Sequence, residues 1–358
     1  MRMATALLEV SDLKVAFRTE RGIVRALFGV SFSVEPGETL GLVGESGCGK
    51  TVTALSILRL LASPPAVVEG GRIGFGGKEL LALSEEEMCG VRGKEISMIF
   101  QEPMTSLNPV LTIGEQVAEV YTAHGTCGKA ESARRAQEWL RRVKMPDPAR
   151  RMQEYPHQMS GGMRQRAMIA MALALEPALL IADEPTTALD VTIQAQILAL
   201  LKEMREQERK MAILLITHDL GVVHEFADRV AIMYLGRIVE IAKTPDLFAD
   251  PIHPYTQGLL QSLPGKSVGE KRLPSIPGTV PDLGAIPPGC PFADRCPFRR
   301  DALERFRAGA AARDELEVCD RTDPPLEEYA PHHFAACHFQ RMERKEREAA
   351  RKAAGDDG

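Results

Sequence analysis

A glycine-rich octapeptide, Gly44 to Thr51 with the sequence GESGCGKT, constrains the fold of this chain more than any other stretch. The apolar run 39–43 precedes it and a run with helical spacing, 51–61, follows it, so we expect a strand, a loop and a helix. In that context, the pattern GxxxxGK[ST] predicts a loop whose backbone N–H groups surround phosphates, with Lys50 at the β and γ phosphates and Thr51 ligating Mg²⁺. The alternative is a glycine-rich turn that binds nothing. The candidate nucleotide-binding residues are Gly44, Ser46, Gly47, Cys48, Gly49, Lys50 and Thr51.

The bulk composition limits the classes of protein to consider. With 358 residues, 44% hydrophobic and 26% charged, the chain is long enough for one large domain and a smaller one. Its net charge of -5 gives no reason to expect nucleic acid as the main partner. No run reaches the roughly 20 apolar residues of a membrane helix, and Glu9 and Asp12 interrupt any signal-peptide core, so we expect a cytoplasmic chain. Seven cysteines, an odd number, argue against a disulfide framework.

Strand and helix signals alternate along most of the chain. The apolar runs 179–183 and 212–217 predict buried strands, with a helix between them. This alternation predicts an α/β protein with a parallel sheet that helices cover on both faces. Residues 7–17 and 25–34 predict a β layer ahead of the glycine-rich loop, and a helical insertion is expected at about 103–164.

The texture of the sequence changes near residue 250. Residues 264–297 are rich in Pro and Gly, which is typical of a boundary region. We therefore expect a large domain over residues 1–250 and a small cysteine-containing domain over 251–340. The remainder, 341–358, is charged and rich in alanine, which predicts a frayed helix or a disordered tail.

Two carboxylates, Asp183 and Glu184, follow directly where the predicted strand 179–183 ends. The carboxyl ends of parallel strands form the edge where ligands collect in open α/β sheets. Asp183 is in a position to hold Mg²⁺ through water, opposite Thr51. Glu184 is in a position to polarise an attacking water as a general base. The alternative is a pair of acids that caps the next helix.

Gln101 and His218 also follow predicted strands. Adjacent parallel strands bring their ends to the same edge, so His218, one strand-helix-strand unit after Glu184, is placed to donate to the γ phosphate. Gln101 is placed to contact Mg²⁺ or the attacking water. The alternatives are a structural histidine and an ordinary surface amide.

A second phosphate-binding arrangement, Ser160-Gly161-Gly162, opens another predicted helix. A hydroxyl and free N–H groups at the positive end of a helix suit an anion. Because the chain already has one such loop, the economical explanation is that this one serves the nucleotide of a partner chain. An ordinary helix cap is the alternative.

Taken together, these residues resemble the ATPase subunits of ABC transporters. The resemblance implies ATP and Mg²⁺ and a P-loop fold, with a RecA-like parallel-sheet core, a β subdomain and an α-helical subdomain. It also implies that Phe17 stacks on adenine. The signature departs from the usual LSGGQ at Met159 and Met163. The matching motifs are GESGCGKT (Walker A), Gln101 (Q-loop), MSGGM at 159–163 (signature), LLIADE at 179–184 (Walker B), Ala188-Leu189-Asp190 (D-loop) and His218 (switch histidine).

Longer strings are similar to the ATPases of oligopeptide and dipeptide importers. They are FQEPMTSLNP at 100–109, SGGMRQRAMIAMAL at 160–173, HPYTQGLL at 253–260 and PPGCPFADRCPF at 287–298. This resemblance implies a peripheral ATPase at the cytoplasmic face of the inner membrane. Its implied partners are a second ATPase subunit, either a related chain or a copy of itself, two transmembrane permease subunits and an extracytoplasmic peptide-binding protein.

Two other functions stay open on the sequence. Nickel importers of the same subfamily share the first two of these strings, so an ATPase of an importer of nickel or another small solute is one alternative. A soluble ABC protein acting on DNA or ribosomes is the rival from another class. Such proteins typically carry two cassettes or a long coiled-coil insertion, and this sequence has one cassette and a short helical insertion.

Four cysteines, Cys290, Cys296, Cys319 and Cys337, occur in the C-terminal region. A small Pro-rich segment has little core of its own, which favours a metal staple. The close CxxC pairs of a zinc ribbon are absent. The resemblance implies a [4Fe–4S] cluster, and zinc and inert or redox-active thiols are the alternatives. The other three cysteines, Cys48 among them, are expected to be packing residues.

Overall fold

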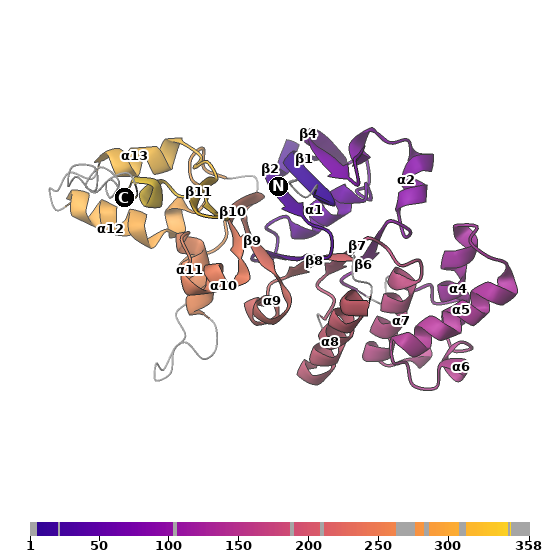
Figure 1. Ribbon diagram of the computed structural model, residues 1–358. Helices are drawn as coiled ribbons and strands as arrows, with labels where there is room; N and C mark the ends of the chain where they lie inside the picture. Colours follow the sequence, from indigo (N-terminus) through magenta and orange to yellow (C-terminus); the bar gives the residue numbers. More distant parts are fainter. Residues whose placement is uncertain are drawn as a thin grey trace.

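The computed structural model of the chain contains a four-stranded sheet, an eight-stranded sheet and flanking helices (Figure 1). In Figure 1 the N-terminal strands, in indigo, lie near the middle of the molecule. The magenta helices lie at one end and the yellow C-terminal helices at the other. The structure describes residues 6–20, 22–102, 106–186, 190–207, 211–262, 276–282, 286–307, 313–342 and 344.

The eight-stranded sheet forms the centre of the protein. Its strands are β3 (Thr39–Val43), β6 (Ile96–Ile99), β7 (Leu179–Asp183), β8 (Ala212–Thr217), β9 (Arg229–Tyr234), β10 (Arg237–Lys243), β11 (Glu327–Ala330) and β12 (His333–Ala335). Their order is β11-β12-β10-β9-β3-β8-β7-β6, and the five strands from β9 to β6 are parallel. Every residue of β3, β7 and β8 is buried, as in a sheet covered on both faces. The strands expected at 179–183 and 212–217 are confirmed.

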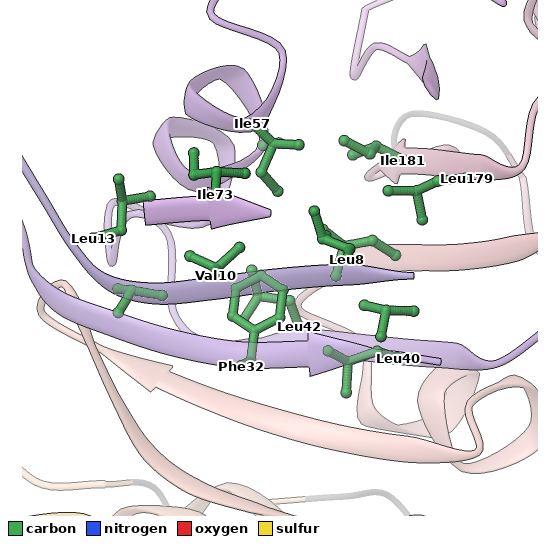
Figure 2. Packing of buried hydrophobic residues seen from close by; sticks show 14 of the residues in the cluster. Leu8, Val10, Leu13, Phe32, Leu40, Leu42, Ile57, Ile73, Leu179 and Ile181 are labelled. Carbon is green, nitrogen blue, oxygen red and sulfur yellow. The ribbon is translucent and has the colours of Figure 1, made fainter. Parts of the chain in front are cut away.

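A second, antiparallel sheet packs beside the first. It is formed by β1 (Leu8–Thr19), β2 (Gly22–Val34), β4 (Ala66–Phe75) and β5 (Lys78–Glu79), in the order β2-β1-β4-β5. Leu8 and Ile73 from this sheet, Leu42 from β3 and Ile181 from β7 belong to one buried cluster (Figure 2). The β layer expected ahead of the glycine-rich loop is confirmed, and Gly49 of the loop lies close to Leu27 of β2 and Met233 of β9.

Helices occur on both sides of β7 in the sequence. They are α1 (Lys50–Ile57), α2 (Glu85–Val91), α4 (Ile113–Ala123), α5 (Lys129–Arg142), α6 (Pro148–Arg151), α7 (Gly161–Leu173), α8 (Val191–Gln207) and α9 (Leu220–Phe226). Helices α1, α7 and α9 contact the central sheet. A capping box of Thr112 and Glu115 starts α4. Trp139 and Leu140 of α5 pack with α4 and α7 in a second core cluster. None of the described helices combines the length and the apolar character needed to cross a bilayer.

The C-terminal region joins the central sheet. Its elements before β11 are α10 (Thr244–Ala249), α11 (Pro254–Gln261), the 3-10 helix η4 (Ala293–Arg295), α12 (Pro297–Arg307) and α13 (Arg313–Arg321). Strand β12 pairs antiparallel with β10, and Glu240 stands opposite Ala335. The central sheet and a third core cluster include residues on both sides of residue 250. The domain boundary expected near that residue stays a prediction. Most of the predicted tail 341–358 lies outside the described residues.

A buried carboxylate connects the parts of this region. Glu240 is fully buried, and its oxygens accept hydrogen bonds from the backbone N–H groups of Ile252, at 2.8 Å, and His253, at 2.9 Å. Nε2 of His333, in β12, lies 2.7 Å from Oε1 of the same side chain. Both carboxylate oxygens therefore have partners, as a buried charged group requires.

The buried His253 predicts a loss of stability in mild acid. Its pKa is lowered from 6.5 to about 4, because burial disfavours the imidazolium more than Glu240 favours it. As pH falls from 6.5 towards 4, the unfolded chain binds a proton that the folded chain does not, so the free energy of unfolding falls by about 3 kcal/mol. Urea unfolding at several pH values measures this dependence. His253→Gln should weaken it, whereas His224→Gln, at an exposed position, should not. Equal dependence in wild type and His253→Gln would contradict the assignment.

Candidate functional site

The glycine-rich loop has the backbone of an anion-binding nest. Gly47 and Gly49 have φ values of 80° and 109°, in the left-handed region that glycine adopts without a steric penalty. A Cβ atom on Gly47 would meet no atom within 4 Å, so this side of the loop is open. Nζ of Lys50 donates to the carbonyl oxygens of Gly44, at 2.7 Å, and Glu45, at 3.1 Å. The loop therefore presents N–H groups and one nearly buried ammonium group to a phosphate.

Close packing beneath the loop predicts a large effect of one methyl group. A Cβ atom on Gly44 would lie 2.2 Å from the carbonyl oxygen of Met233 and 2.7 Å from Sγ of Cys48. Because backbone cannot yield as a flexible side chain can, Gly44→Ala should lower the free energy of unfolding by about 1–3 kcal/mol. The matched control is Gly90→Ala in α2, where the added Cβ would meet nothing within 4 Å. Urea denaturation compares the two variants, and equal midpoints would refute this reading of the loop.

Asp183, the last residue of β7, has the surroundings expected of a metal ligand. It is 1% exposed, and within the described part of the chain its Oδ1 has no hydrogen-bond partner. Burial raises its pKa, while the neighbouring Thr51 hydroxyl and Lys50 act to lower it. A buried carboxylate oxygen without a partner is costly unless a cation or water satisfies it. Asp183 and Thr51 therefore fit a Mg²⁺ ion, which usually takes one or two protein ligands beside substrate phosphates and water.

The three predicted catalytic residues meet at the carboxyl edge of the sheet. Nε2 of Gln101 donates to Oε2 of Glu184 at 3.0 Å, and Nδ1 of His218 lies 3.3 Å from Oε1. Glu184 has a φ of 45°, which is uncommon for a residue with a side chain, and its N–H donates to the oxygen of Ile216 in β8 at 2.9 Å. Such a backbone persists only where the surroundings fix it, and it is often found at functional sites. The cluster can orient a water molecule and accept its proton.

The other predicted binding residues lie on β1 and at the starts of α7 and α8. Phe17 is half-buried in β1 and packs against the first core cluster. Ser160 is exposed and caps α7, its hydroxyl accepting from Met163 N–H at 3.4 Å. Oδ1 of Asp190 accepts from Ile193 N–H at 2.9 Å where α8 begins, and the other two residues of the predicted D-loop, 188 and 189, lie outside the described residues. Their contacts with a nucleotide stay predictions.

The four C-terminal cysteines are all buried and share the third core cluster. Cys290 N–H donates to the carbonyl oxygen of Cys319 at 2.8 Å. Burial raises the pKa of Cys337 to about 12, and the nearby thiols of Cys296 and Cys319 add to the shift. Across the residues that the structure describes, however, no three His, Cys, Asp or Glu side chains form a group that could hold a metal ion. The expected [4Fe–4S] cluster thus gains no support from this geometry.

Sequence reasoning missed the residues that contact Glu45 inside the loop. Arg295 forms an ion pair with its carboxylate, and the hydroxyl of Tyr255 accepts a hydrogen bond from its N–H. These partners are 250 and 210 positions away in the sequence. The cysteines of the string CPFADRC led to the prediction of a metal site. No sequence pattern indicates that the arginine in this string contacts the glycine-rich loop.

Comparison with known proteins bears on the whole chain. Residues 27–187 match the family described as ABC transporter, and residues 239–302 match the oligopeptide/dipeptide transporter C-terminal region. The dipeptide transport ATP-binding protein DppD of Bacillus subtilis is 53% identical over 86% of this chain and 92% of its own length. The oligopeptide transport ATP-binding protein OppD of Salmonella typhimurium is 48% identical over 93% and 94%, respectively.

A solved structure agrees in fold. A dimeric, post-hydrolysis structure of an ATP-binding cassette bound to ADP and phosphate is 28% identical, with a TM-score of 0.60. It covers 66% of this chain and 98% of the cassette. The predicted P-loop ABC fold is thus confirmed. With relatives near 50% identity over almost their full length, the chain belongs to the ABC transporter ATPases, in the group that carries the oligopeptide/dipeptide transporter C-terminal region.

Proposed function

We propose that this chain is the ATP-hydrolysing subunit that energises the import of di- and oligopeptides across the cytoplasmic membrane. The observation that carries the ATPase part is the meeting of Gln101 and His218 at Glu184, next in sequence to Asp183, whose Oδ1 has no hydrogen-bond partner among the residues that the structure describes. The peptide part is supported by the C-terminal region and by relatives whose names specify dipeptide and oligopeptide transport.

Each residue of the site has a proposed role. The backbone of the loop that ends at Lys50 binds the phosphates, Phe17 stacks on adenine, and Thr51, Asp183 and Gln101 hold Mg²⁺. When bound, Mg²⁺ would neutralise charge on the phosphates. Glu184 accepts the proton of the attacking water, and Gln101 and His218 orient its carboxylate from either side.

The Ser160-Gly161-Gly162 turn, in which Ser160 and Gly161 are exposed, supports a dimer of cassettes. Within the described part of the chain, no hydrogen bond joins this turn to the phosphate loop, so we propose that it contacts the nucleotide of a second ATPase subunit, with Asp190 at the shared face. ATP should therefore dimerise the Glu184→Gln protein, and Ser160→Arg should prevent this. Size-exclusion chromatography with and without ATP measures the effect, and dimerisation that survives Ser160→Arg would contradict it.

The other proposed partners are two transmembrane permease subunits and an extracytoplasmic peptide-binding protein, with the ATPase peripheral at the cytoplasmic face of the inner membrane. Uptake in a strain that lacks this chain tests the proposal. Loss of labelled peptide uptake, restored by the wild-type chain, is expected, and nickel uptake should be unchanged. Loss of nickel uptake alone would favour a nickel importer. Co-purification with nucleic acid instead of permeases would favour a soluble ABC protein.

We further propose that Cys290, Cys296, Cys319 and Cys337 hold a [4Fe–4S] cluster. The support is the family resemblance; the four thiols are buried in one apolar cluster. Protein purified without oxygen should contain iron and sulfide and absorb visible light, and Cys296→Ser should reduce all three. Zinc in their place would favour a zinc site, and protein without metal would leave four structural thiols.

A further inference from the structure

The phosphate loop contains an acidic residue, Glu45, at its second position. A carboxylate there is unfavourable for a loop that binds a polyanion, because like charges repel at short range. The structure provides a counter-charge. Nη1 and Nη2 of Arg295 donate to Oε2 and Oε1 of Glu45 at 2.8 Å and 3.2 Å, the two-pronged geometry in which arginine recognises carboxylates.

Arg295 is held in place by the C-terminal region. Its side chain is 5% exposed, Nε donates to the carbonyl oxygen of Pro277 at 3.1 Å, and Nη1 lies 3.4 Å from the hydroxyl of Tyr234. The rings of Tyr234, Tyr255 and Phe292 pack against one another beside it, with centroids 4.7–5.4 Å apart. A guanidinium so enclosed has little freedom to leave its partner.

Glu45 is gripped at its backbone as well. Its N–H donates to the hydroxyl of Tyr255 at 3.1 Å, and its carbonyl oxygen accepts from Lys50 at 3.1 Å. The side chain, the N–H and the carbonyl oxygen of this loop residue are thus all fixed, two of them by side chains of the C-terminal region. The conformation of the loop therefore depends on a region of the chain that lies more than 200 positions away.

We propose that Arg295 is a positioning residue for ATP binding: it neutralises and fixes Glu45, and thereby sets the affinity of the phosphate loop for the triphosphate. The inference rests on the proposed ATPase function. It makes the C-terminal region a structural part of the nucleotide site.

The test is a set of variants at the two ends of the pair, read as the Kd for ATP. Arg295→Gln leaves a free carboxylate beside the phosphates and should raise the Kd about 3- to 10-fold. Arg295→Lys keeps the charge and should have a smaller effect. The double variant Glu45→Gln, Arg295→Gln removes the free charge and should recover most of the lost affinity. A purely structural role for Arg295 predicts the same loss in the double variant, and that result would overturn the proposal.

The control is Arg299→Gln, which removes an ion pair with Asp320 inside the C-terminal region, 2.7 Å between Nη2 and Oδ1. It should leave the Kd unchanged. Wild-type protein that binds no ATP would refute the proposed function itself, whereas wild-type affinity in folded Arg295→Gln would refute this inference alone. If that variant does not fold, amide exchange in the wild-type protein decides: ADP should slow exchange in 293–295, because coupling between sites is reciprocal. Unchanged exchange would overturn the proposal.

Discussion

In Glu184→Gln, ATP turnover should fall about 10²-fold or more, because the amide keeps the shape of the side chain but cannot accept the proton of the attacking water. The hydrogen bond with Gln101 can persist because the amide oxygen still accepts, and the contact with His218 can persist where the amide N–H donates to an unprotonated Nδ1. The Kd for ATP should therefore stay close to that of the wild type. Phosphate release measures turnover, and equilibrium binding measures the Kd.

The matched control is Glu225→Gln in α9, which removes the same charge at an exposed position away from the cluster. It should hydrolyse ATP at the wild-type rate. If Glu184→Gln did so too, Glu184 would not be the general base, and another acceptor for the proton would have to be found at this edge of the sheet.

Lys50→Gln should raise the Kd for ATP about 10- to 100-fold, because it removes a hydrogen bond in which the donor is charged. The conformation of the loop in the protein without nucleotide should change less than the affinity for ATP. Lys50 donates to two carbonyl oxygens of its own loop, and a glutamine amide can replace one of these contacts. Lys50→Gln is thus expected mainly to weaken ATP binding, whereas Glu184→Gln is expected mainly to slow ATP hydrolysis.

Lys78→Gln is the matched control for this variant. Its ammonium is half-exposed and pairs with Glu95 at 2.7 Å on the surface, where such pairs contribute little. Unchanged ATP affinity is expected for it. An unchanged Kd in Lys50→Gln would show that the loop binds phosphate through its backbone alone, or that the nucleotide binds elsewhere.

Features that depend on residues close together in the sequence could be predicted more readily than features that depend on distant ones. The loop could be predicted because the spacing of Gly44, Gly49 and Lys50 largely dictates a backbone path. Strands β7 and β8 could be predicted because a short apolar run that begins and ends abruptly is typical of a buried strand. Short helices were harder. Helix α2 escaped notice although Ser84 and Glu87 form a capping box that the sequence already contains.

Contacts between residues far apart in the chain could not be predicted from a single sequence. Nothing in the three residues of β12 indicates that they extend the central sheet, and nothing in Arg295 points to Glu45. Both contacts depend on packing between elements far apart in the chain. The meeting of Gln101, Glu184 and His218 could be foreseen although these residues are 83 and 34 positions apart, because parallel strands bring their carboxyl ends to a common edge.

The pairing of β12 with β10 affects how the protein is made. Until the ribosome has synthesised residue 335, β10 has no partner on one side and Glu240 lacks its contact with His333. An apolar strand with a free edge is a template for aggregation. A prematurely terminated chain would thus be prone to aggregate and to be degraded. The cell would then rarely contain a working ATP-hydrolysing module without its transporter-specific end.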